Sequence, residues 1–200
     1  MQKRSETTRT NILLSAVGLF ARYGYNLTGV AEICTAAGVS KGAFYHHFSS
    51  KQSVFLAIFN DWMNLLDQQI QSARQSTETV PQALEKMLGL FETVFLQAGG
   101  YLPMFLEFWS QASHDPLIWQ VVIEPYQRYR RYFTALIQEG IIEGTIRKID
   151  PQIAASTLVS LTLGLLLQGL LDPKGMDWVD ITRTSVSSYL QSIYIEKSEN

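Results

Sequence analysis

Residues 38–51, GVSKGAFYHHFSSK, decide how the rest of this chain is interpreted. Gly38 permits a tight turn, because glycine adopts positive φ values without steric strain. Ser40 can then cap a short helix. The side chains along that helix are cationic, aromatic and imidazole groups: Lys41, Tyr45, His46 and His47. Such a helix, placed just after another short helix, is typical of a DNA-reading element.

Charge is divided unevenly along the chain. Residues 1–51 contain six basic and two acidic side chains, a balance of +4, whereas the remaining residues sum to −6 and the whole chain to −2. A basic N-terminal region on an acidic body predicts that polyanion binding is confined to the N-terminus.

The composition indicates a globular protein of a reducing compartment. Hydrophobic residues make up 46% and charged residues 17% of the 200 positions, which favours a sizeable core. Cys34 is the single cysteine, so a disulfide framework is excluded and a small buried side chain is expected. The N-terminus, MQKRSETTRT, has no signal-peptide core, and we expect a cytoplasmic protein.

Helical periodicity runs along almost the whole chain and predicts an all-α fold. Gly24 is expected to end the first helix, Thr28 to cap the second, and Gly99-Gly100 to separate two later helices. Apart from the second helix, the expected helices cover about 7–23, 41–48, 51–74, 82–98, 102–113, 116–142, 151–171 and 176–195. Residues 1–51 should form a DNA-binding domain with a helix-turn-helix, and 52–200 a second helical domain, with 51–74 as the connection.

The third helix has an inward and an outward side. Val39 and Phe44 are expected to anchor it. Gly42 and Ala43 are small enough to let it approach base edges, and Ala43 could touch a thymine methyl. Polar residues placed to reach phosphates are Thr28, Tyr45, His47 and Lys51.

These residues resemble the N-terminal domain of the tetracycline-repressor (TetR/AcrR) family of transcriptional regulators. The resemblance covers residues 9–60 and rests on Phe20, Gly24, Thr28, Val30, Ile33, 37–40 (AGVS), Lys41-Gly42, Phe44-Tyr45, His47-Phe48 and Lys51. It implies a homodimer that binds double-stranded palindromic operator DNA, with a divergent C-terminal domain that senses a small molecule.

The resemblance also implies roles for single residues. Phosphate contacts would fall on Thr28, Tyr45, His47 and Lys51, and contacts to bases or the adjoining backbone on Lys41, Gly42, Ala43 and His46. Two positions depart from the family pattern. Gly29 stands where a hydroxyl residue is frequent, which removes one phosphate contact. Ala43 stands where Thr is common, which shifts base readout toward Lys41.

The acidic body contains many aromatic residues that could line a ligand pocket or fill a core. Our effector-binding candidates are Trp62, Phe95, Phe105, Phe108, Trp109, Gln111, Tyr126 and Tyr129. Glu107, Gln111 and His114 have helical spacing and could share one face. Arg128 lies in a small basic cluster that we expect to pair with acids.

No catalytic constellation, phosphate loop or metal-spaced cluster accompanies these candidates, so we expect no enzyme, no metal and no cofactor. The favoured interpretation is a repressor that a small apolar or aromatic effector releases from its operator. Two alternatives remain open: a small-molecule carrier or enzyme with an appended helix-turn-helix, and a ligand-independent partner of other DNA-bound proteins.

Residues 151–171 contain no charged side chain, and the length of this segment is close to that of a membrane span. Ser156, Ser160 and Gly164 recur every four residues, however, and this pattern favours close packing against another helix over a membrane. Together with 176–195 this segment is expected to form the four-helix interface of a homodimer. Its two recognition helices would then read half-sites about one helical turn apart.

Overall fold

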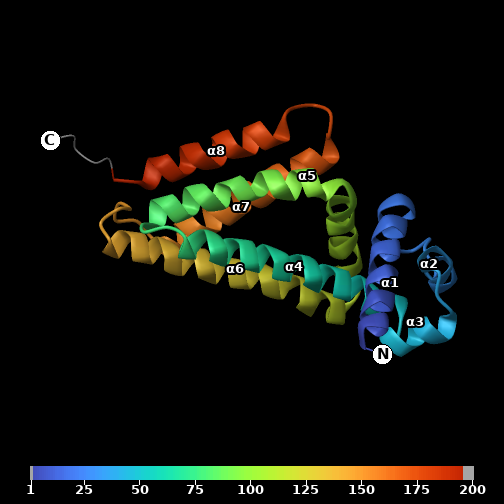
Figure 1. The fold of residues 1–200 in the computed structure, drawn as a ribbon. Helices are drawn as coiled ribbons and strands as arrows, with labels where there is room; N and C mark the ends of the chain where they lie inside the picture. Colours follow the sequence, from blue (N-terminus) through green and yellow to red (C-terminus); the bar gives the residue numbers. More distant parts are fainter. Residues whose placement is uncertain (1, 196–200) are drawn as a thin grey trace. The chain divides into compact units, whose positions relative to one another are not determined.

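The computed structural model describes residues 2–195, and the side chains of 5–90, 106–107 and 109–195. Across these residues the chain forms helices, which confirms the predicted all-α class (Figure 1). The bounds are α1 Gln2–Tyr23, α2 Val30–Ala37, α3 Lys41–His47, α4 Lys51–Gln75, α5 Val80–Ala112, α6 Pro116–Ile142, α7 Pro151–Leu171 and α8 Trp178–Ile193.

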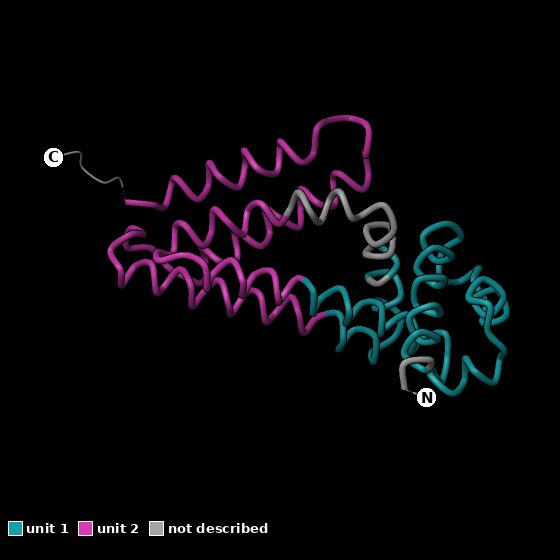
Figure 2. The backbone as a smooth tube through the Cα atoms, in the orientation of Figure 1, with its two compact units in different colours: residues 1–65, 98–122 teal, residues 66–97, 123–200 magenta. Residues whose placement is uncertain are grey.

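Two compact units divide the chain (Figure 2). Unit 1 comprises residues 1–65 and 98–122, and unit 2 comprises residues 66–97 and 123–200. Unit 1 therefore joins the three N-terminal helices to the start of α4, the end of α5 and the start of α6. The remainder of these three helices belongs to unit 2, with α7 and α8.

The core of unit 1 combines aliphatic side chains with a group of aromatic rings. α1 contacts both α2 and α3, and α2 contacts α3. Phe44 of α3 is fully buried, as expected for its anchor. The ring of Phe20 meets that of Phe55 edge-on at 5.6 Å, and the ring of Tyr25 lies 4.5 Å from Phe55. Edge-on aromatic pairs of this kind add to the free energy of burial.

The turn of the helix-turn-helix has the predicted geometry. Gly38 has a φ of 66°, in the left-handed region that favours glycine. The Ser40 hydroxyl accepts a hydrogen bond from the Ala43 amide at 3.1 Å and thereby caps α3. Ser50 caps α4 in the same way, accepting from the Ser53 amide at 3.0 Å. Cys34 is buried in α2, which confirms its expected packing role.

Two sequence-based expectations about helix boundaries are wrong. The N-cap of α2 is Gly29 and not Thr28, because the Thr28 hydroxyl donates instead to the carbonyl of Gly24 at 2.9 Å. The predicted break at Gly99-Gly100 does not occur, because α5 continues from Val80 to Ala112. Glycine weakens a helix by about 1 kcal/mol but does not forbid the helical conformation.

Unit 2 has an aliphatic core. Fully buried members include Val80, Ile137, Ile146 and Leu190, and α7 packs against α8. Asp150 caps α7 by accepting from the amides of Gln152 and Ile153 at 2.8 and 3.1 Å. Pro151 occupies the first helical position, where its fixed φ suits a helix and its missing N–H costs no hydrogen bond within the helix.

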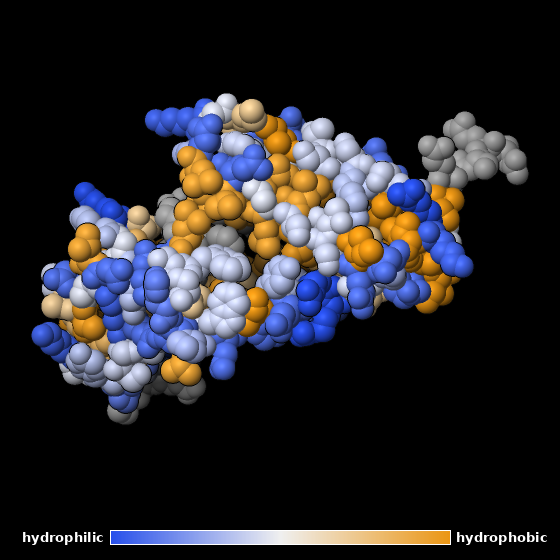
Figure 3. All heavy atoms as spheres, turned by 180° about the vertical axis from the view of Figure 1, so that it is seen from behind, coloured by the Kyte–Doolittle hydropathy of each residue, from blue (hydrophilic) through white to orange (hydrophobic). Residues whose placement is uncertain are grey.

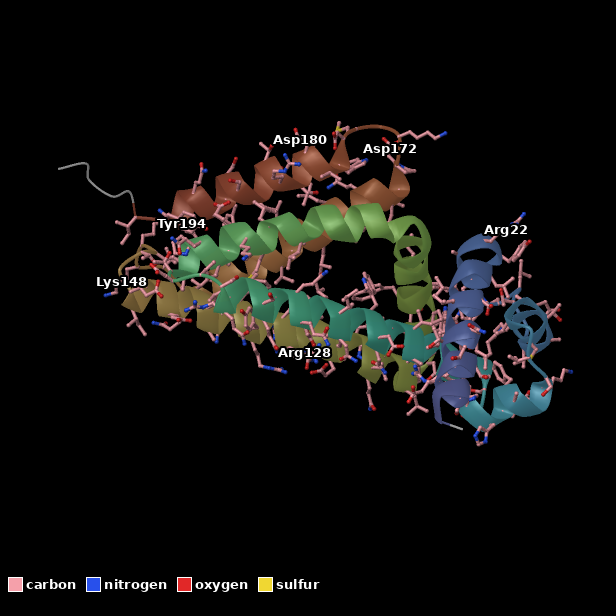
Figure 4. All side chains as sticks on the ribbon, viewed as in Figure 1. Arg22, Arg128, Lys148, Asp172, Asp180 and Tyr194 are labelled. Atoms are coloured by element: carbon pink, nitrogen blue, oxygen red, sulfur yellow. The ribbon has the colours of Figure 1, made fainter. Side chains whose placement is uncertain are left out.

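Polar side chains hold α4 to α6 within unit 2. Asp67 accepts from the Tyr129 hydroxyl at 2.8 Å and forms an ion pair with Arg128 at 2.7 Å. Further along both helices Arg74 pairs with Glu139. The two helices run parallel and side by side, and Arg128 is labelled on α6 in Figure 4. The prediction that Arg128 pairs with acids is confirmed.

α7 is the helix with the length and composition to cross a membrane, among the residues that the structure describes. A core helix of a soluble protein passes the same test. Here Ala155, Leu158 and Leu165 of α7 are buried in the core of unit 2. This packing agrees with the interpretation of 151–171 as a packed helix.

Candidate nucleic-acid interface and effector region

The outward side of α3 is the candidate DNA-contacting surface. Lys41, Gly42 and His46 are exposed, and the Tyr45 side chain is 55% exposed. Ala43 and His47 are half-buried. Because Phe44 is buried beneath and Ser40 caps the first turn, this side of α3 is held in place from within unit 1. A short capped helix with an exposed polar side is the geometry that major-groove reading requires.

Two of the predicted phosphate contacts have internal partners in this structure. Thr28 is 2% exposed, and its hydroxyl donates to Gly24. Lys51 donates from Nζ to the carbonyl of Tyr25 at 2.7 Å, and Nζ lies 4.1 Å from the centre of the Tyr25 ring. Burial lowers the pKa of the Lys51 ammonium, and the charge of Glu107 opposes this change. Both residues therefore shape the loop between α1 and α2, and their phosphate role stays a prediction.

Tyr45 and His47 keep their polar groups near the surface of α3. The Tyr45 ring meets the buried Phe44 ring edge-on at 5.3 Å. The rings of His46 and His47 meet edge-on at 5.1 Å. These contacts restrict the side chains without using the Tyr45 hydroxyl, which leaves the predicted contacts to phosphates geometrically open.

The effector candidates are divided between the two units. Phe95, Phe105 and Phe108 lie outside the described side chains. Trp62, Trp109 and Gln111 belong to unit 1, whereas Tyr126 and Tyr129 belong to unit 2. All five of these described side chains are half-buried.

Several of these candidates have contacts that sequence reasoning did not provide. In unit 1 the Trp109 ring meets the Trp119 ring edge-on at 6.1 Å, and Gln111 donates to Glu107 at 2.9 Å. In unit 2 Tyr129 donates to Asp67, while the Arg130 guanidinium lies 5.8 Å from the Tyr126 ring. Tyr129 thus has a role in joining helices in addition to its predicted place in a pocket.

Asp115 and Gln52 are polar residues of unit 1 that the sequence did not indicate. Asp115 precedes α6, and Gln52 lies in the first turn of α4. Gln52 Nε2 donates to Asp115 Oδ2 at 2.9 Å. Their separation in sequence leaves no local signal for this contact. No group of three His, Cys, Asp or Glu side chains that could hold a metal occurs within the described residues.

Two short helices joined by a glycine turn, the second with an exposed polar side, define a helix-turn-helix protein. The family model for bacterial regulatory proteins of the tetR family matches residues 12–58, and that for the C-terminal domain of BetI-type transcriptional repressors matches residues 101–194. Together they cover more than half of the chain.

Known relatives agree with these matches. The chain is 28% identical to the HTH-type transcriptional repressor KstR2 of Mycolicibacterium smegmatis over 141 residues, which cover 70% of this chain and 67% of the relative. It is 24% identical to the HTH-type transcriptional regulator UidR of Escherichia coli K12 over 172 residues, 83% of each.

A solved structure has the same fold. A transcriptional regulator from Saccharomonospora viridis, in complex with choline, superposes with a TM-score of 0.83 at 24% identity, covering 94% of this chain and 98% of that one. The chain belongs to the TetR family of transcriptional regulators and is a DNA-binding regulator.

Proposed function

We propose that this regulator is a repressor that leaves a palindromic operator when a small apolar or aromatic effector binds. The observation that carries the DNA side is the exposed surface of α3, held from beneath by Phe44 and capped by Ser40. Residues 1–51 would bind operator DNA, and residues 52–200 would bind the effector and form the dimer. The protein acts in the cytoplasm and has no catalytic role in this proposal.

Gly42 offers a direct test of operator reading. A Cβ added at Gly42 would meet only the Ser40 hydroxyl at 3.8 Å, and one added at Gly18 of α1 would meet nothing within 4 Å. Both glycines are exposed in helices, so leucine at either position should raise stability by roughly 0.5–1 kcal/mol. A leucine at Gly42 would project from α3 toward the major groove of the proposed operator, whereas a leucine at Gly18 would not.

The test begins by selecting an operator from a random duplex library with the purified protein. We expect a palindromic site, and we expect Gly42→Leu to weaken binding to it about tenfold or more, equivalent to ~1.4 kcal/mol. Gly18→Leu is the matched control and should bind as the parent does. Equal operator affinity of Gly42→Leu and Gly18→Leu would refute the role of α3 in reading the operator. A selection that yields no palindromic site would contradict the operator proposal.

The dimer is proposed to form through α7 and α8. Exposed apolar side chains of α7 include Ile153 at 67% and Leu171 at 71%, and a groove on the same helix is lined by Gln152, Ile153, Ser156, Thr157, Ser160 and Leu161. Apolar residues are visible in this part of unit 2 when the molecule is viewed from behind (Figure 3). The proposed occupant of this surface is a second copy of the chain. In a dimer with two-fold symmetry, the same surface of each subunit becomes buried against the other.

Sedimentation of the purified protein tests the dimer. Ile153→Lys should convert a dimer into a monomer, since a charge would be buried without a partner at the interface. Ile142 at the end of α6 is 78% exposed, and Ile142→Lys is the matched control that should leave the mass unchanged. A monomeric parent protein, or a dimer that survives Ile153→Lys, would refute this interface.

Release by an effector requires that the effector prefer the state that does not bind DNA. Choline is a second candidate beside an apolar compound, because the Saccharomonospora viridis structure contains it. The edge-on Trp109–Trp119 pair provides aromatic faces that attract ammonium groups.

Operator affinity measured with and without each probe separates these candidates. The probes are choline chloride and the aromatic dye 8-anilinonaphthalene-1-sulfonate. An apolar effector site predicts that the dye alone weakens operator binding, by about 5–150-fold if the coupling is of ordinary size. Release by choline alone would favour the ammonium class, and a probe that binds without changing operator affinity is not an effector.

A further inference from the structure

A single carboxylate joins the first turns of two helices in unit 1. Asp115 Oδ1 accepts from the Leu117 amide at 2.8 Å and caps α6, while Oδ2 accepts from Gln52 of α4 at 2.9 Å. A hydrogen bond to an ionised carboxylate is stronger than a hydrogen bond between two neutral groups. The hydrogen bonds from Leu117 and then Gln52 lower the pKa of Asp115, because both stabilise its charged form. We call the Gln52–Asp115 pair the polar link.

The α4 end of the polar link adjoins the recognition helix. α3 ends at His47, and α4 begins at Lys51, so Gln52 follows within one short turn. Lys51 donates to the Tyr25 carbonyl, and the Tyr25 ring packs against Phe55. The first turn of α4 is therefore attached to the loop between α1 and α2 as well as to α3.

A second carboxylate lies beside the same attachment. Glu107, near the end of α5, accepts from Gln111, and its Oε2 lies 3.9 Å from the position that a Cβ on Gly24 would occupy. Burial and the charges of Asp115 and Glu107 raise the pKa of Tyr25. Two acids outside the helix-turn-helix, Glu107 and Asp115, thus lie close to the Tyr25–Lys51 contact and support the loop between α1 and α2.

We propose that Gln52 and Asp115 are positioning residues for operator binding: the polar link fixes the first turn of α4 and, through it, the placement of α3. The proposal rests on the proposed reading role of α3. Neither residue is required to touch DNA. Their effect should therefore appear in specific binding, which depends on the placement of α3, more than in non-specific binding, which depends on net charge.

Exchanging the acid and the amide tests this link without changing its size. Gln52→Glu places two carboxylates together and breaks the hydrogen bond. Asp115→Asn keeps a hydrogen bond, because the Gln52 amide can rotate and accept from the new amide. The double variant, Gln52→Glu with Asp115→Asn, again pairs one acid with one amide and has the parent's net charge. Asn60→Asp, an exposed amide-to-acid change on α4 in unit 1, controls for added negative charge.

Affinities for the selected operator and for a random-sequence duplex are measured for all five proteins, well below their melting temperatures. Gln52→Glu should lose about tenfold in operator affinity. It should lose no more than Asn60→Asp does on the random duplex. Asp115→Asn and the double variant should bind the operator within about twofold of the parent.

Two results would overturn the proposal. One is a double variant as weak on the operator as Gln52→Glu alone, since pairing would then be irrelevant. The other is a Gln52→Glu protein that binds the operator no more weakly than Asn60→Asp. A parent protein that selects no operator would instead contradict the proposed function, so the two failures are distinguishable.

Discussion

α4 meets α6 in both units, but the contacts differ in kind. In unit 1 the polar contact that the structure describes is the polar link, a hydrogen bond between an amide and a carboxylate. In unit 2 Asp67 takes part in an ion pair with Arg128 and a hydrogen bond from the partly buried Tyr129. A contact with several partners costs more to break than one with a single partner. The comparison indicates that less free energy is needed to break the polar contacts between α4 and α6 in unit 1 than in unit 2.

The largest expected effect comes from removing the acceptor in unit 2. Asp67→Ala should lower the free energy of unfolding by about 2 kcal/mol, because Arg128 and Tyr129 both lose their partner while Arg128 keeps partial solvent access. Urea denaturation measures this value. A loss no greater than that of an exposed pair would show that the two units hold α4 and α6 with similar strength.

A smaller effect is expected from Tyr129→Phe, which removes one hydrogen bond and leaves the Asp67–Arg128 pair. We expect a loss of about 1 kcal/mol near pH 8. Burial and then the hydrogen bond to Asp67 raise the pKa of the Tyr129 hydroxyl. The folded state therefore retains this proton more tightly than the unfolded state does.

The stability from Tyr129 should be complete below the ordinary tyrosine pKa of about 10 and should decrease as pH rises above it. Urea denaturation of the parent and Tyr129→Phe at about pH 8 and about pH 11 measures the difference. A difference that grows with pH would contradict the direction of the pKa shift.

Gln52→Ala should destabilise the fold less than Tyr129→Phe does, although our proposal predicts that it lowers operator affinity. Asp115 retains the amide of Leu117, and water can replace the Gln52 amide at this partly exposed position. Thermal denaturation and operator titration of the same sample test both statements. A melting temperature that falls further than that of Tyr129→Phe would reverse the comparison.

The smallest effect is predicted for Asp61→Ala. Asp61 pairs with Arg9 at 3.6 Å, and both side chains are about half exposed. Exposed pairs contribute about 0–1 kcal/mol, so the change in unfolding free energy should fall within about 0.5 kcal/mol. This variant supplies the baseline for Asp67→Ala, because both acids lie on α4 and pair with arginine.

Sequence predicted helix starts well where a proline and a capping residue occur together. α6 and α7 have the expected bounds, and their first residues are Pro116 and Pro151, preceded by Asp115 and Asp150. The Gly99-Gly100 break was wrong because a propensity of about 1 kcal/mol per glycine competes with the hydrogen bonds of a long helix. Local signals are strongest where a backbone group must be capped.

The inward and outward sides of α3 could also be predicted, because the burial of Phe44 follows from helical spacing. The internal partners of Thr28 and Lys51 could not, since Gly24 and Tyr25 lie in a loop whose path depends on packing. The contacts of Asp67 with Arg128 and Tyr129 likewise lacked a local signal. They depend on which helices become neighbours, and helical periodicity gives only the side that is buried.

The Asp115 cap gives the chain a built-in spectroscopic reporter. Amides in the first turn of a helix have no partner within the helix and exchange their hydrogen with water rapidly unless a side chain accepts from them. The amide of Leu117, on an exposed residue, donates to Asp115 Oδ1. Its exchange rate therefore records whether that carboxylate is in place, and it can be followed in the intact protein as DNA or small molecules are added.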